Sequence, residues 1–309
     1  MAGFAVMGTM EVWYARLDED DLLQAVRRAT AKAPKKRAKT ARREEKTVRK
    51  EAAKARTRDS LQALSKLGEL VDGHYRIVSQ PPIVIPARDL EATFGLSRDQ
   101  VEDELREQFR AYRATLRDDR RQLLERFEIL DMARKVVGVG SVGCLAYIVL
   151  LQGRDQDDPL FLQVKEATRS VLEGPLPKSR HQEHGERVVY GQRMMQAASD
   201  IYLGWSRGIV DVNRHFYWRQ LRDMKASVDV ETMTPAALTF YARTCGWTLA
   251  RAHARSGDPI AIATYLGERD QFDRSITDFS ERYADQNERD YQAFASAIRS
   301  GRLQALEGV

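Results

Sequence analysis

Hydrophobic positions in the first part of the chain recur every three or four residues, which is the spacing of an amphipathic helix. Residues 1–26 show this pattern and are predicted to be helical. Residues 35–70 are rich in Ala, Lys, Arg and Glu, which favour helix, and their second half adds an apolar stripe. We therefore predict one long helix there, ended by Gly73. Ser97 and Gln100 form a capping box, which predicts the start of another amphipathic helix.

The pattern changes to strand-like runs after Lys135, and a helix is predicted only at residues 183–198 within this region. Two extended segments around Pro81-Pro82 predict a further pair of strands about a turn. From Thr234 onward the chain is predicted to be helical, with Pro235 at the first helical position. The predicted strands after residue 135 are residues 144–151, 160–167, 201–205 and 215–221.

Helices therefore precede and follow a strand-rich centre. This order predicts an α+β fold with a small, mostly antiparallel sheet and one inserted helix. We predict three regions. Residues 1–72 form a helical segment with a basic arm, residues 73–225 contain the glycine-rich loop and the sheet, and residues 226–309 form a C-terminal helical lobe.

Composition narrows the class of protein. The chain has 309 residues, of which 43% are hydrophobic and 31% charged, enough to build a globular core. Two cysteines form neither a disulfide framework nor a metal-ligand spacing. The longest apolar run, Val142–Leu151, is too short to span a bilayer. We predict a cytoplasmic protein that is neither secreted nor membrane-spanning.

Charge is concentrated in one segment. Residues 27–58 hold fifteen Lys or Arg against three acids, a local net charge of +12, so the remainder of the +5 chain carries −7. Such a segment can bind nucleic acid through its phosphates, or an acidic partner. It has no interleaved aromatic residues and no zinc spacing. A solvated helix without a ligand is the alternative interpretation.

A glycine-rich run, Gly138-x-Gly140-Ser141-x-Gly143, is the first candidate for chemistry. Glycines let backbone N–H groups approach phosphate oxygens closely. The run leads into a predicted strand rather than a helix, which argues against a dinucleotide-binding turn, and no Lys-Ser or Lys-Thr pair follows it. The alternative is a tight glycine hairpin without a ligand.

Lys165 lies on the second predicted strand after this run, which is the layout of a protein kinase. In that layout the lysine binds the α- and β-phosphates and pairs with a glutamate of the next helix. Glu183 and Glu186, at the start of the predicted helix 183–198, are the candidates for this glutamate. The alternative is a solvent-facing lysine on an edge strand.

The run LARAHARSGD at residues 249–258 offers two further polar residues. His253 suits the C-terminal end of a helix, where a cation is favoured. Asp258 has two interpretations: a loop residue without a chemical role, which is the commoner case, or a catalytic base.

Several longer motifs carry a resemblance to a known family. They are RKVVGVGSVG (134–143), LFLQVKEA (160–167), GQRMMQAASD (191–200), RQLRDMK (219–225) and LARAHARSGD (249–258). Together, in this order, they resemble the uncharacterised bacterial domain-of-unknown-function family numbered 2252. The resemblance runs over most of the chain and implies a kinase-like, two-lobed arrangement, related to phosphotransferases.

The resemblance also exposes departures. Relatives carry a Gly-Asp-x-His stretch and an Asp-Phe-Asp, which look like a catalytic loop and a metal-binding aspartate, before the glycine-rich run. This sequence has neither, and it has Cys144 and Leu145 where relatives often have Thr-Arg. The resemblance therefore implies a chain truncated at its N-terminus.

These observations predict binding of ATP with little or no phosphoryl transfer. The expected contacts are with Gly138, Gly140, Ser141, Gly143 and Lys165, and the ligands of the accompanying Mg²⁺ are not identified in the sequence. The alternative is a non-catalytic binding module that uses residues 27–58 to bind nucleic acid or an acidic partner.

Overall fold

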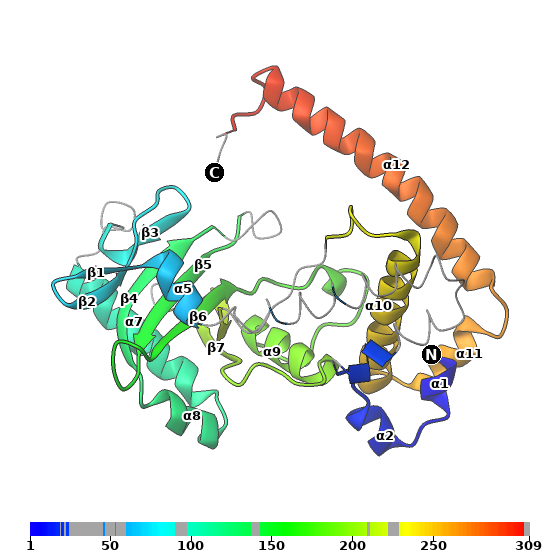
Figure 1. The fold of residues 1–309 in the computed structure, drawn as a ribbon, viewed down its shortest axis with the longest axis horizontal. Helices are drawn as coiled ribbons and strands as arrows, with labels where there is room; N and C mark the ends of the chain where they lie inside the picture. Colours follow the sequence, from blue (N-terminus) through cyan, green and yellow to red (C-terminus); the bar gives the residue numbers. More distant parts are fainter. Residues whose placement is uncertain are drawn as a thin grey trace. The chain divides into compact units, whose positions relative to one another are not determined.

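The computed structural model describes residues 1–18, 60–89, 98–136, 143–208, 211–221 and 229–305, with a few isolated positions between them. These residues form helices together with antiparallel sheets of two and six strands (Figure 1). The predicted α+β class is therefore confirmed. Most of the basic segment and residues 137–142 of the glycine-rich run lie outside the described residues.

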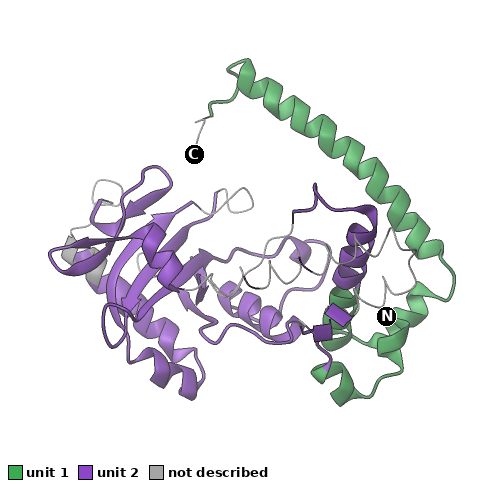
Figure 2. Cartoon of the chain, in the orientation of Figure 1, with its two compact units in different colours: residues 1–14, 247–309 green, residues 15–246 purple. Residues whose placement is uncertain are grey.

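The chain divides into two compact units (Figure 2). Unit 1 combines Met1–Tyr14 with Trp247–Val309, and unit 2 is Ala15–Gly246. This division differs from the three regions predicted from the sequence, because unit 1 joins the two ends of the chain.

Six antiparallel strands form the large sheet of unit 2, in the order β3-β4-β5-β6-β8-β7. The centre of the sheet is buried on both faces, which is why β5 and β6 read as almost continuous apolar runs. The strands are β3 (Val84–Pro86), β4 (Glu128–Lys135), β5 (Ala146–Gln152), β6 (Pro159–Glu166), β7 (Gly204–Arg207) and β8 (His215–Gln220).

Helices α7 (Arg98–Ala114) and α8 (Asp118–Leu124) contribute to the core on one face of the sheet. Trp218 of β8 is fully buried there and stacks on Tyr112 of α7, with ring centroids 4.4 Å apart and an interplanar angle of 8°. The Tyr112 hydroxyl donates a 2.6 Å hydrogen bond to the Tyr202 carbonyl, so this buried polar atom is satisfied. Burial raises the pKa of Tyr112 well above its ordinary value.

Helix α5 (Ser60–Leu67) packs its apolar side chains against the opposite face, beside Phe161 of β6. The predicted long helix is wrong at its end, because β1 (Gly68–Val71) and β2 (His74–Ile77) follow it as a hairpin. Asp72 and Gly73 both have positive φ, as a two-residue turn requires.

The predicted pairing around Pro81-Pro82 is also wrong, because the two segments belong to different sheets: β2 pairs with β1, and β3 pairs with β4. Arg88, in the short 3-10 helix η1 (Ala87–Asp89), connects them. It donates to the Ile77 carbonyl and to Asp131 Oδ2, each over 2.8 Å. Burial nevertheless raises the pKa of Asp131.

Helix α9 (His184–Met195) confirms the inserted helix and packs against β7 and β8. It follows the short 3-10 helix η3 (Val171–Glu173). Gly185 allows the close approach, because a Cβ built at this residue would lie 2.2 Å from the Phe216 carbonyl oxygen.

Unit 1 is helical. The predicted helix over residues 1–26 is wrong, since α1 (Ala2–Ala5) and α2 (Thr9–Tyr14) are separate and residues 15–18 are not helical. Phe4 contacts Trp247 with ring centroids 5.5 Å apart, and the Arg255 guanidinium lies 4.0 Å from the Trp13 ring centroid. The remaining helices are α10 (Pro235–Ser256), shared between the units, α11 (Pro259–Leu266) and α12 (Gln271–Arg299).

Two details of unit 1 bear on the sequence predictions. Asp258 is the N-cap of α11, where its carboxylate accepts hydrogen bonds from two backbone N–H groups. Beyond residue 269, where the chain is predicted to be helical, α12 is one continuous helix. Within the described ranges, no helix is both long and apolar enough to cross a membrane.

Two glycines of α9 provide a matched test of its packing. We expect Gly185→Ala to lower the free energy of unfolding by about 1–3 kcal/mol, because the new methyl group overlaps the Phe216 carbonyl. Gly191→Ala should raise it by about 0.5–1 kcal/mol, since its Cβ makes only an ordinary contact and alanine favours helix. Urea unfolding measures both. Equal effects of the two substitutions would contradict the packing of α9 on β8.

Candidate functional site

Lys165 lies near the end of β6, opposite Ala146 of β5 and Tyr217 of β8. The neighbouring positions Val164 and Leu162 face the core under α7, so alternation places Lys165 on the other face of the sheet. Its side chain is half-buried. Lys165 is therefore on an interior strand of the sheet, not on an edge strand.

The glycine-rich run belongs to the connection between β4 and β5, and Ala146, the first residue of β5, is opposite Lys165. Gly138, Gly140 and Ser141 lie outside the described residues. Gly143 is described and has a φ of +83°, a conformation that favours glycine. Two residues later, the Leu145 N–H donates to Glu166 Oε2 over 2.9 Å, and Arg214 donates to Glu166 Oε1 over 2.8 Å. Glu166 therefore holds the end of the glycine-rich run against the sheet.

Arg219 is a second cation on the face that carries Lys165. It lies opposite Gln163 in the pairing of β8 with β6, two residues along from Tyr217, which faces Lys165. Burial lowers the pKa of Lys165, and the positive charge of Arg219 lowers it further. Among the described residues, no carboxylate forms an ion pair with either cation.

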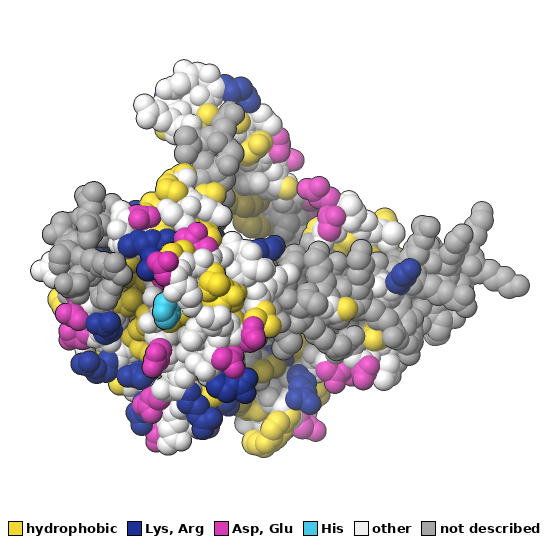
Figure 3. Space-filling view, turned by 60° about the vertical axis from the view of Figure 1, so that its left-hand side comes forward, with side chains coloured by type: hydrophobic (Ala, Val, Ile, Leu, Met, Phe, Trp, Pro, Cys, Tyr) yellow, Lys and Arg dark blue, Asp and Glu magenta, His cyan; other side chains and the backbone are white. Residues whose placement is uncertain are grey.

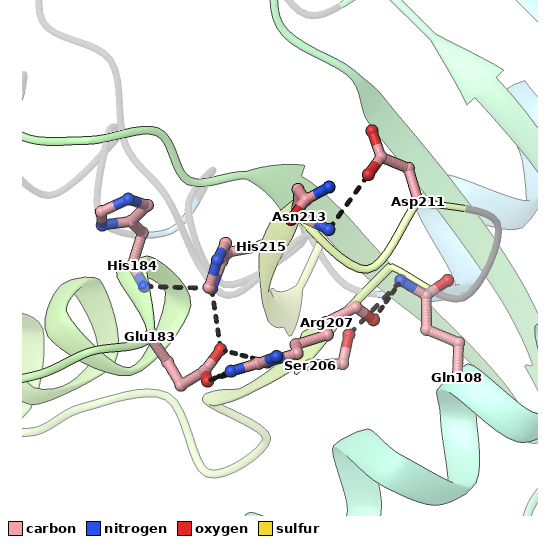
Figure 4. Close-up of polar contacts among 8 residues, drawn as sticks. All are labelled: Gln108, Glu183, His184, Ser206, Arg207, Asp211, Asn213 and His215. Carbon is pink, nitrogen blue, oxygen red and sulfur yellow. Dashed lines mark hydrogen bonds and ion pairs between the residues drawn. The ribbon is translucent and has the colours of Figure 1, made fainter.

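Glu183 lies at the N-terminus of α9 in a cluster of polar side chains (Figure 4). Arg207 Nε donates to its two carboxylate oxygens over 2.8 and 3.0 Å, and Arg207 Nη2 also donates to Oε1. His215 Nδ1 lies 2.8 Å from Oε2 and 3.3 Å from the backbone nitrogen of His184. A single Nδ1 atom cannot both donate to the Glu183 carboxylate and accept from the His184 N–H. The shorter contact is the one to the carboxylate, which favours a proton on Nδ1.

The electrostatics of this cluster follow from its contacts. The hydrogen bonds from Arg207 lower the pKa of Glu183, and the charges of Arg207 and His215 act in the same direction. Burial lowers the pKa of His184, and His215 lowers it further. Gln108 of α7 donates to the Arg207 carbonyl and to Ser206 Oγ, which fixes β7 from the other side (Figure 4). The cluster therefore anchors the start of α9 to the edge of the sheet.

Glu186 has a different partner. Its carboxylate lies 3.2 Å from His181 Nδ1, in the segment before α9. The His181 ring contacts Tyr190 of α9, with ring centroids 4.7 Å apart, and the Arg180 guanidinium lies 4.6 Å from the Tyr190 centroid. The structure thus brings neither Glu183 nor Glu186 into an ion pair with Lys165.

Within the part of the chain that the structure describes, no group of three or more His, Cys, Asp or Glu side chains could hold a metal ion.

The sequence pattern of the family described as "Uncharacterized protein conserved in bacteria (DUF2252)" matches residues 1–297. The chain belongs to this family. No curated protein and no solved structure matches the chain.

Sequence reasoning about this DUF2252 chain missed three residues of the region: Arg207, His215 and Arg219. A signal for two of them was present. In β8 the polar or amphipathic residues His215, Tyr217 and Arg219 alternate with buried Phe216 and Trp218. This alternation shows that they share one face, although it does not show which strand lies beside them.

The anchor at Glu183 predicts a pH dependence of stability in this DUF2252 protein. Its folded-state pKa is depressed, so the stabilisation is fully present above the unfolded value of about 4.3 and is lost as the pH falls through the folded value. Urea unfolding should therefore show a stability difference between the wild type and Glu183→Gln that shrinks as the pH is lowered below that range.

Arg207→Gln is the matched partner variant. It should reproduce the effect of Glu183→Gln, and the double variant should add little to either, because both remove the same interaction. A difference from wild type that stays constant with pH would contradict the role of this ion pair.

Proposed function

We propose that this DUF2252 chain is a kinase-like protein that binds the phosphates of ATP through Lys165 and the glycine-rich run of Gly138, Gly140, Ser141 and Gly143. One observation carries the proposal: Lys165 is a half-buried cation that lies beside another cation and has no ion pair with a described carboxylate. A cation in such a place is costly unless an anion compensates it. Phosphate groups are anions that accept charge-assisted hydrogen bonds from such cations.

The order of elements supports this choice of ligand. In protein kinases a glycine-rich loop joins two strands, the next strand carries the lysine, and the following helix carries its glutamate. Here the glycine-rich run joins β4 to β5, Lys165 is on β6, and α9 follows. Backbone N–H groups of such a run can cradle phosphate oxygens close to the lysine.

This structure differs from the kinase layout at the glutamate that would pair with the lysine. Glu183 is held by Arg207 and His215, and Glu186 lies beside His181. A Lys165 pair with either residue requires these contacts to be exchanged. An ion pair of Lys165 with Glu183 or Glu186 therefore stays a prediction for the nucleotide-bound state. The proposal rests on Lys165 and the glycine-rich run alone.

The proposal is limited to binding. The sequence contains neither the Gly-Asp-x-His stretch nor the Asp-Phe-Asp that the resemblance associates with catalysis. In-line phosphoryl transfer depends on placing the metal and the nucleophile. Magnesium would enter with the nucleotide, as the counter-ion of its phosphates.

A thermal-shift titration with ATP and Mg²⁺ tests the proposal. A ligand at about 100 times its Kd adds about 2.7 kcal/mol to stability, which is a visible shift in Tm. We expect a saturable shift in the wild type and a much weaker one in Lys165→Ala. Lys178→Ala is the matched control, because Lys178 is exposed in the segment before α9.

Two results would contradict the proposal. One is a cooperative unfolding transition of the wild type that ATP does not shift. The other is an equal shift in the wild type and in Lys165→Ala, since a lysine that binds phosphate contributes a charge-assisted hydrogen bond.

The basic segment supports a second candidate function, the binding of nucleic acid or an acidic partner. The net charge of +12 in residues 27–58 favours it. On the face shown in Figure 3, Lys and Arg side chains of the described residues are interspersed with Asp and Glu. The described side chains visible on that face therefore form no continuous basic surface.

Fluorescence anisotropy with a short duplex tests this candidate. Binding through residues 27–58 should weaken steeply with salt, by about one decade of affinity per decade of salt for each phosphate contact. Replacing the Lys and Arg of this segment by Gln should remove both the binding and the salt dependence. Equal binding by this variant would contradict the candidate.

A further inference from the structure

We propose that Arg219 is a second phosphate-binding residue, and that Lys165 and Arg219 together form a two-cation site for a polyphosphate on one face of the sheet. This inference rests on the proposed function and deepens it, because the kinase layout supplies the lysine but no such arginine. Three features of the described residues carry it: the strand register, the missing partners, and the contrast with neighbouring arginines.

The register places the two cations side by side. Lys165 is opposite Tyr217, and Arg219 is two residues further along β8, so the cations are diagonal neighbours on the same face. Diagonal neighbours on one face of an antiparallel pair are about 7–8 Å apart, measured between their backbone positions. Two long side chains at this separation can converge on one phosphate or on two adjacent phosphates.

Among the described residues, Arg219 has no hydrogen-bond partner that would account for the burial of its Nε. Its Nε is buried and has no hydrogen-bond partner in the structure. No described carboxylate pairs with its guanidinium. A buried, unsatisfied donor on a charged group is costly, and a like charge nearby adds to the cost.

Three other arginines around the sheet have carboxylate partners, unlike Arg219. Arg207 is bound to Glu183, Arg214 to Glu166 and Arg88 to Asp131. The sequence thus supplies carboxylates to arginines that position elements of the fold, and it places an uncharged residue, Gln163, directly opposite Arg219. An arginine that binds an anionic ligand must have donors that are not already paired with a carboxylate, and Arg219 meets this requirement.

The chemistry of the two groups favours a polyphosphate over a single charge. The guanidinium offers a planar fork of donors that matches two phosphate oxygens, and the ammonium acts as a compact point charge. Tyr217 lies directly opposite Lys165 and two residues before Arg219 on the same face of β8. Burial raises the pKa of its hydroxyl, so it stays neutral and can donate to the same anion. The phosphates could come from a nucleotide or from inorganic polyphosphate.

The test is a titration of the full chain with ATP-Mg²⁺, ADP, adenosine and inorganic tripolyphosphate, followed by calorimetry. We expect affinity to rise with the number of phosphates, and Arg219→Gln to weaken ATP and tripolyphosphate by about tenfold to a hundredfold, as for a charged hydrogen bond. Arg154→Gln is the matched control, because it removes the same charge from an exposed side chain in the turn between β5 and β6. Arg219→Lys should restore part of the affinity.

The outcomes separate the two proposals. If Lys165→Ala abolishes ATP binding and a folded Arg219→Gln binds ATP as the wild type does, the inference is wrong and the proposed function stands. If tripolyphosphate binds in an Arg219-dependent way and ATP does not bind, the two-cation site stands and the nucleotide is wrong. If the folded wild type binds neither ligand, both are overturned.

A second readout does not depend on affinity. Acylation of Lys165, followed by mass spectrometry, reports its neutral fraction at about pH 8. Arg219→Gln should slow this acylation several-fold, because the nearby positive charge that favours the neutral amine is gone. Tripolyphosphate should protect Lys165 in the wild type, while Lys178 should react alike in all samples.

Equal acylation of Lys165 in the wild type and in Arg219→Gln, with no protection by tripolyphosphate, would overturn the inference. If Arg219→Gln does not fold, Arg219→Lys and the protection of Lys165 in the wild type decide the matter in the same way.

Discussion

The pairing of β6 with β5 on one side and β8 on the other is the interaction on which the rest of unit 2 depends. Leu162 and Val164 face the core under α7, and Phe161 faces α5. These buried residues hold β6 in a single register, because a shift by one residue would move Lys165 into the apolar core. The same register brings Lys165 beside Arg219. Burial of apolar side chains on both faces of the sheet thus positions Lys165 and Arg219, although neither cation belongs to the apolar core.

Carboxylates then connect the surrounding elements to this sheet. Asp131 receives hydrogen bonds from Arg88 and from the Ile77 N–H, which joins the β1–β2 hairpin to β4. Glu166 joins the end of the glycine-rich run to the residue before β8, and Glu183 joins α9 to β7 and β8. In each case a charged hydrogen bond crosses between segments far apart in sequence. Their shared role is structural, which separates them from the two cations on β6 and β8.

The proposed function and the structural role of Glu183 meet at α9. The helix start is anchored by an ion pair that is largely complete without Lys165. Phosphate binding at Lys165 and Arg219 would neutralise those cations without breaking this anchor. Anchoring of the helix and recognition of an anion can therefore operate on the same sheet face through separate groups.

Sequence reasoning reached the local features. The alternation of Phe161, Gln163 and Lys165 against Leu162 and Val164 predicts β6 and the face of its lysine, and the spacing in residues 183–198 predicts α9. The turn at Asp72-Gly73 carried a hairpin signal that the helix-favouring composition before it obscured. These features depend on neighbours within a few residues, so the chain determines them by itself.

The tertiary structure decided what depends on distant neighbours. Strand β3 pairs with β4 rather than with β2, and β8 inserts beside β6 while β7 takes the edge. No local pattern specifies such pairings, because each is selected by the burial of many side chains at once. The contact of Glu183 with Arg207 and His215, and the placing of Arg219 beside Lys165, follow from these pairings. The sequence alone therefore determined which residues could carry charge on that face, and only the folded sheet decided which of them meet.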